Sequence, residues 1–99
     1  MDLERFLASL DDATPPESLA PLLLALWHER RGDWTRAHEI AQDVDDRDGA
    51  WVHAYLHRRE GNRANAGYWY RQARQPVESG GLDREWRAIV EALLARDNG

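Results

Sequence analysis

The chain has 99 residues, 42% of them hydrophobic and five of them Trp, with a formal net charge of −5. This size and composition predict one domain with its own core and exclude a wholly disordered chain. The negative charge argues against nucleic acid as the main partner. The absence of Cys excludes disulfides and thiolate chemistry, and no apolar run reaches the length of a membrane span.

These properties lead us to expect a cytoplasmic protein that does not bind membranes. The first residues contain no basic segment followed by an apolar run, so they do not resemble a signal peptide. All thirteen basic residues are arginine, a composition typical of a GC-rich bacterial genome.

The first predicted helix covers residues 2–10. Asp2 can cap its amino end, because a carboxylate there accepts a free backbone N–H. Apolar side chains recur at helical spacing and form one stripe, namely Leu3, Phe6, Leu7 and Leu10.

The second predicted helix has two candidate starting points. Thr14 and Glu17 have the spacing of a capping box, with proline at the first helical position. A start at Thr14, however, would carry Pro21 past the first turn at a cost of about 3 kcal/mol, whereas a start at Ser18 keeps it inside that turn. In either case the helix continues to Arg31.

Two further boundaries have the same punctuation, a glycine that ends one helix and a polar residue that caps the next. These pairs are Gly32-Asp33 and Gly61-Asn62. Asp48 is the expected cap of the fourth helix, and Pro76 is expected to stop the fifth. The remaining predicted helices are 34–44, 50–60, 63–74 and 82–96.

Short connections predict that neighbouring helices are antiparallel, so the chain is expected to form hairpins. We expect a single domain, 1–99, in four parts. These are an N-terminal helix (1–13), a first hairpin (14–46), a second hairpin (47–76) and a C-terminal helix (82–97).

The two hairpins are related by an offset of 29 residues, which places small residues of one on those of the other. Ala25 and Ala54 each lie seven residues before a glycine, and Ala37 and Ala66 each follow that glycine by five. In the second unit Tyr70, Ala73 and Pro76 complete the pattern. Over about residues 19–76 the chain resembles the tetratricopeptide family, whose usual repeat is about 34 residues.

This resemblance implies an all-α, right-handed array of stacked antiparallel hairpins with about six helices. The last helix would cap the stack, with Arg84, Arg87 and Glu91 on its outer face. The first helix of each hairpin would line a concave groove. By register, the groove would be formed by Leu22, Leu26, Glu29, Arg30, Trp51, Tyr55, Arg58 and Arg59.

The function implied by such a groove is non-enzymatic binding of a peptide or a helix. Trp, Tyr and Arg are enriched at binding hot spots. We therefore expect Trp51 and Tyr55 to anchor the partner and Arg58 and Arg59 to orient it. Leu26 and Arg30 complete the predicted partner-binding set.

The charges are unevenly distributed, and this points to the chemistry of the partner. Residues 50–74 contain five arginines and one acid, whereas residues 39–48 contain five acids and one arginine. The basic second hairpin favours an acidic peptide. A homodimer is the alternative, because two repeats bury little apolar surface. The aromatic run at 68–70 is interpreted as packing rather than as a base-stacking platform.

Histidines supply the other candidate site. His53 and His57 are four residues apart on one helix face, a spacing that suits two ligands of one metal ion. His28 is the repeat equivalent of His57 and is expected to approach it, whereas His38 is expected to face solvent. The main interpretation is that the pair is structural, with no metal and no cofactor. A metal-binding protein or metalloenzyme is the alternative.

Overall fold

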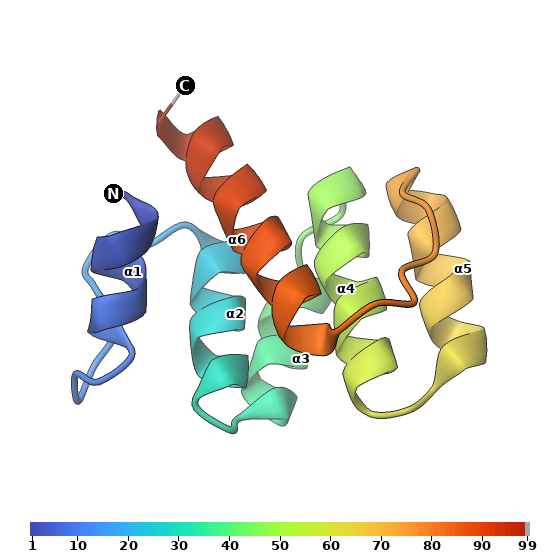
Figure 1. Cartoon of the computed structure of the whole chain (residues 1–99), viewed down its shortest axis with the longest axis horizontal. Helices are drawn as coiled ribbons and strands as arrows, with labels where there is room; N and C mark the ends of the chain where they lie inside the picture. The colour runs from blue at the N-terminus through green and yellow to red at the C-terminus, as the bar shows by residue number, and fades with distance from the viewer. Residues whose placement is uncertain (99) are drawn as a thin grey trace.

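The computed structural model describes residues 1–98, which form six α-helices and no strand (Figure 1). This confirms the predicted all-α class. None of these helices is long and apolar enough to cross a bilayer. In chain order they are α1 (Leu3–Ser9), α2 (Pro21–Arg30), α3 (Trp34–Gln42), α4 (Arg47–Arg59), α5 (Arg63–Ala73) and α6 (Leu82–Asn98).

The predicted punctuation between helices is confirmed. The Asp2 carboxylate accepts the backbone N–H of Arg5 and caps α1. Asp33 and Asn62 cap α3 and α5 in the same way. Gly32 and Gly61 precede these caps with φ of +90° and +88°, a left-handed conformation that glycine adopts without steric cost.

Two predicted starting points are wrong. Helix α2 begins at neither Thr14 nor Ser18 but at Pro21, which occupies the first helical position, where a missing N–H costs nothing. Ser18 instead adopts a left-handed φ of 60°, outside the helical range. Helix α4 is capped by Asp46, two residues before the predicted cap Asp48.

The helices pack as two hairpins, α2 with α3 and α4 with α5, and α3 joins them by packing against α4 (Figure 1). Helix α6 does not cap the end of this arrangement as predicted. It lies across α2 and α4 and also touches α1. The reason is its apolar stripe of Trp86, Ile89 and Val90, which is buried against the first helix of each hairpin.

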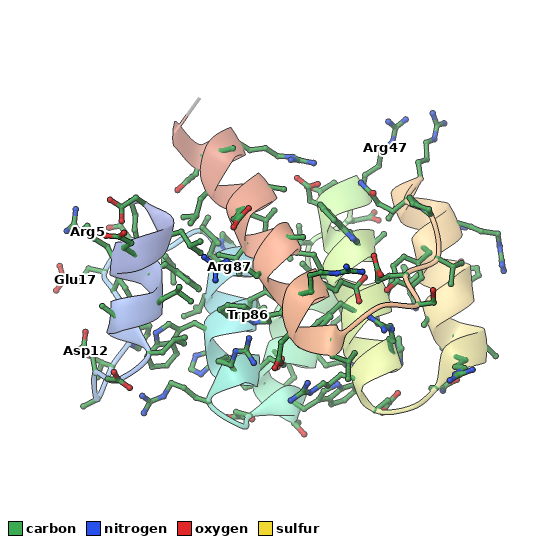
Figure 2. All side chains as sticks on the ribbon, viewed as in Figure 1. Arg5, Asp12, Glu17, Arg47, Trp86 and Arg87 are labelled. Atoms are coloured by element: carbon green, nitrogen blue, oxygen red, sulfur yellow. The ribbon has the colours of Figure 1, made fainter. Side chains whose placement is uncertain are left out.

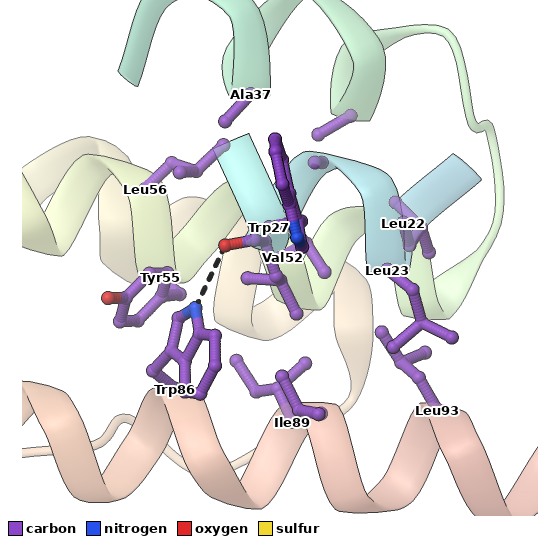
Figure 3. Packing of buried hydrophobic residues seen from close by; sticks show 14 of the residues in the cluster. Leu22, Leu23, Trp27, Ala37, Val52, Tyr55, Leu56, Trp86, Ile89 and Leu93 are labelled. Atoms are coloured by element: carbon purple, nitrogen blue, oxygen red, sulfur yellow. Dashed lines mark hydrogen bonds between the residues drawn. The ribbon is translucent and has the colours of Figure 1, made fainter. Parts of the chain in front are cut away.

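The main core therefore lies between α6 and the α2/α4 pair (Figure 3). Trp86 reaches from α6 toward α2 (Figure 2), and its indole N–H donates to the carbonyl of Leu26 at 3.1 Å. Its ring also packs 6.0 Å from that of Phe6 in α1. This hydrogen bond lets a large aromatic side chain be buried with its polar atom satisfied.

Candidate functional site

Helix α6 covers the face of α2 and α4 that was predicted to be an open peptide groove. Leu26 and Tyr55 are both fully buried beneath it. Neither side chain can contact a partner while α6 is in place. The prediction of an open groove is therefore corrected, because the chain's own C-terminal helix occupies it.

Polar contacts to Glu85 of α6 fix this arrangement. Its buried carboxylate accepts a hydrogen bond from the Arg58 guanidinium at 2.8 Å and another from the Tyr70 hydroxyl. Nearby, the Tyr55 hydroxyl donates to the buried Glu29 at 2.5 Å. Burial and then these hydrogen bonds raise the pKa of both tyrosines, so both hydroxyls keep their protons.

The other predicted partner-binding residues lie at the rim of the same contact. Arg30 donates to Asp83 of α6 at 2.8 Å, and its guanidinium lies 4.2 Å from the centre of the Trp86 ring. Arg59 lies 3.8 Å from the same Asp83 carboxylate. Trp51 is half-buried and packs against the core. The structure thus brings the predicted partner-binding residues together, but they contact or surround α6 instead of lining an open groove.

A different face of α4 carries His53 and His57, and here the structure brings three histidines together. His38 of α3 meets them, and the potential ligand nitrogens of all three lie within 4.8 Å of one another. The Nε2 atoms of His38 and His53 are 2.9 Å apart, and the His53 and His57 rings are stacked 4.9 Å apart. We call these three residues the histidine cluster.

Two tryptophans hold the rings of the cluster. Trp34, one turn before His38 on α3, stacks on it at 4.9 Å and 12°, and its indole N–H donates to the Leu56 carbonyl at 2.7 Å. Trp69 of α5 stacks on His53 at 4.0 Å and 10°. Side chains from three helices, α3, α4 and α5, therefore fix the positions of the rings.

Burial favours the neutral form of two of these imidazoles, those of His38 and His53. Burial, and then the charges of the neighbouring rings, lower the pKa of His53 to about 4. Burial and His57 likewise lower the pKa of His38. His57 has a carboxylate at its other nitrogen, with Nδ1 at 2.7 Å from Glu60 Oε1. Neutral imidazole is the form that binds a metal ion.

The membership of the cluster differs from the prediction in one residue. His28 was expected to approach His57, but its ring contacts Trp27 at 5.2 Å and lies outside the cluster. His38, expected to face solvent, takes that place. It was missed because its position depends on how α3 packs against α4. The spacing of His38 from Trp34, one helical turn, was the available signal.

A third feature is a stripe of arginines on α5, which packs only against α4 among the described helices. Arg63 and Arg71 are exposed on the same side of the helix, and Arg74 is the exposed residue with left-handed backbone that ends it. Within residues 1–98 no carboxylate forms an ion pair with these arginines. The adjacent Tyr68 is 47% exposed. We call these three arginines the arginine stripe.

The chain was also compared with known proteins. No protein-family model, no curated protein and no solved structure matches it. Its function must therefore be argued from the α6 contact, the histidine cluster and the arginine stripe.

Proposed function

We propose that the chain is a cytoplasmic, non-enzymatic protein-interaction module whose two hairpins stack in the tetratricopeptide manner and whose partner is an acidic protein segment. The observation that carries this proposal is the arginine stripe. Two exposed arginines of α5 and the exposed arginine that ends it form no ion pair with another described residue. Elsewhere in the described chain, most arginines are engaged by carboxylates or carbonyls.

The stripe has the dimensions and chemistry for a run of carboxylates. From Arg63 to Ala73 helix α5 extends about 15 Å, the length of several residues of an extended peptide, and Arg74 follows directly after it. Each guanidinium can bind a carboxylate through two parallel hydrogen bonds. The Arg71 guanidinium lies back over Gly67, with Nη1 3.7 Å from the position that a Cβ would take there.

The α2/α4 face is disfavoured as the docking surface. A partner there would have to displace α6 and expose Trp86, Ile89 and Val90, which are at most 1% exposed. Each such side chain contributes about 1.5–3 kcal/mol or more by its burial. Displacement would therefore cost much of the stability of a domain of this size.

Two other functions, a homodimer formed through the stripe and an enzyme, are also disfavoured. The arginine stripe repels itself, so two copies are not expected to pair through it. The buried carboxylates of Glu29 and Glu85 are both engaged by tyrosine hydroxyls, which favours a structural role over general acid or base catalysis.

The test is fluorescence anisotropy with a labelled, glutamate-rich peptide of ten residues. We expect the triple variant Arg63→Glu, Arg71→Glu, Arg74→Glu to bind it at least about tenfold more weakly than the natural chain. The matched control changes Arg5, Arg47 and Arg87 to Glu, which alters the net charge equally at other sites. It should lose much less.

Neutral and lysine-rich peptides and a single-stranded RNA of similar length complete the comparison. Preference for the acidic peptide, weakening with salt, is the expected result. Equal losses in the stripe variant and the control would contradict the proposed surface. Tighter binding of the RNA would contradict the proposed partner class.

A further inference from the structure

We propose that His38, His53 and His57 bind one divalent transition-metal ion, with Zn²⁺ as the best match, at the contact between the two hairpins. The site comprises α3 of the first hairpin and α4 of the second. It is separate from the arginine stripe, and neither proposal depends on the other.

One pair of nitrogens already has nearly the spacing that one ion requires, and the nitrogen of His57, within 4.8 Å of the other two, would move closer on binding. Zn²⁺ binds imidazole nitrogen at about 2.0–2.1 Å, so two ligands of a tetrahedral ion are about 3.3 Å apart. The Nε2 atoms of His38 and His53 are 2.9 Å apart, as a hydrogen-bonded pair. An ion would take the place of the proton between them, and that proton would move to Nδ1 of the same ring, so that both imidazoles stay neutral. The two nitrogens would move apart by a few tenths of an ångström.

The donor set selects the class of metal. Three imidazoles and no thiolate suit Zn²⁺, Ni²⁺ or Cu²⁺, whereas Mg²⁺ and Ca²⁺ prefer oxygen ligands. Three histidines leave the fourth tetrahedral position of Zn²⁺ for water or an outside ligand. All three ligands are neutral, so a bound ion keeps its full charge.

The residues that contact the three histidines are of the kinds that surround the ligands in established metal sites. Ligating histidines commonly donate their other N–H to a carboxylate, which fixes the tautomer and orients the ring. Glu60 provides this contact to His57 Nδ1, so Nε2 is the nitrogen of His57 that is left to bind the metal ion. Stacking on Trp34 and Trp69 restrains the rings of His38 and His53.

Metal binding at this place has a structural consequence. The ion would connect α3 to α4, the contact through which the two hairpins meet. Because the unfolded chain does not hold the three rings together, the ion binds the folded state preferentially and stabilises it. Bound Zn²⁺ would therefore cross-link the two hairpins and stabilise their contact.

The experiment combines calorimetric titration with Zn²⁺ and visible absorption with Co²⁺ on the purified full chain after EDTA treatment. We expect one Zn²⁺ per chain and the absorption of a four-coordinate Co²⁺ with nitrogen ligands. At about 100 times the Kd, Zn²⁺ should raise the Tm by roughly 10–20 °C. His38→Gln, His53→Gln and His57→Gln should each weaken binding about 100-fold, and Glu60→Gln about tenfold.

His28→Gln is the matched control, since His28 is the histidine outside the cluster, and it should bind Zn²⁺ like the natural chain. Circular dichroism without metal establishes that each variant is folded. The Co²⁺ spectrum of the natural chain tests the site even where a variant does not fold. Three results would each overturn the proposal. They are no binding at 100 µM Zn²⁺, which corresponds to a binding free energy of about −5.5 kcal/mol or weaker, a six-coordinate Co²⁺ spectrum, and equal losses of affinity in the control and in the cluster variants.

Discussion

The two faces of α4 show opposite ways of using polar side chains. On one face, Arg58 donates to the Glu85 carboxylate of α6, and the Tyr55 hydroxyl beside it donates to the Glu29 carboxylate of α2. On the other face, His53 and His57 face histidine and tryptophan, and much of their contact is ring stacking. The first face is saturated, whereas the second retains nitrogen lone pairs that an ion could use.

The difference teaches that residue type alone does not separate a binding surface from a core. Trp, Tyr and Arg are typical of hot spots, yet here they fix the chain's own last helix. Contacts in which every polar group has a partner stabilise the fold, and three imidazole rings gathered in one place have a chemical capacity beyond packing. The following changes would break or sharpen this contrast.

The largest effect should come from truncating a tryptophan on the α6 face. Trp86→Ala removes a fully buried ring and leaves a cavity, so we expect the free energy of unfolding to fall by about 3–5 kcal/mol. Trp69→Ala, on the histidine face, removes a half-buried ring and should cost about 1–2 kcal/mol. Urea denaturation at low temperature measures both. Equal losses would abolish the distinction between the faces.

The next effect concerns the buried carboxylate. Glu85→Gln leaves Arg58 without its charge partner, and we expect a loss of about 2–4 kcal/mol. Adding Arg58→Met should recover part of this loss, because the unpaired buried charge is then removed. A double-mutant cycle in urea measures the coupling between the two residues. Strict additivity would show that the ion pair does not hold α6.

The third effect is a pH dependence from the histidine face. The folded-state pKa of His53 is about 4, below its value of 6.5 when unfolded, so the unfolded chain binds the proton first. Its contribution to stability is complete above pH 6.5 and decreases as the pH falls toward 4, by about 1–3 kcal/mol.

Urea denaturation in EDTA across this pH range measures that dependence. The slope between pH 6.5 and 5 should be smaller in His53→Gln, whereas the His28→Gln control should retain most of it. An unchanged slope in His53→Gln would show that this ring is not buried as a neutral imidazole.

The smallest effect on stability should be that of the arginine stripe. Arg71 is exposed and has no ion pair to another described residue, so Arg71→Ala should change stability by no more than about 0.5 kcal/mol. The same variant should weaken binding of the acidic peptide measurably. A large loss of stability without a loss of binding would assign Arg71 to the fold.

Much of the secondary structure could be predicted because it is encoded locally. The glycines with positive φ and the caps at Asp33 and Asn62 act within one turn of chain. The buried side chains of Trp86, Ile89 and Val90 recur at helical spacing, so the buried face of α6 is also encoded locally. The start of α2 was missed because a capping pattern at Thr14 competed with Pro21, and the proline decided the boundary.

The tertiary partners of these faces could not be predicted in the same way. Whether α6 covers the end of the stack or lies across α2 and α4 depends on contacts between residues about sixty positions apart, such as Trp86 with Leu26. The same limit applied to His38. Its helix face was visible in the sequence, but the approach of α3 to α4 was not.

The most direct test of the contrast is a crystal structure of the chain grown with one equivalent of Zn²⁺, with anomalous data collected at the zinc edge. We predict a single strong peak about 2.0–2.1 Å from nitrogens of His38, His53 and His57, with α6 still seated on α2 and α4. A strong peak elsewhere, or an unmetallated histidine cluster in crystals that contain zinc, would contradict the account.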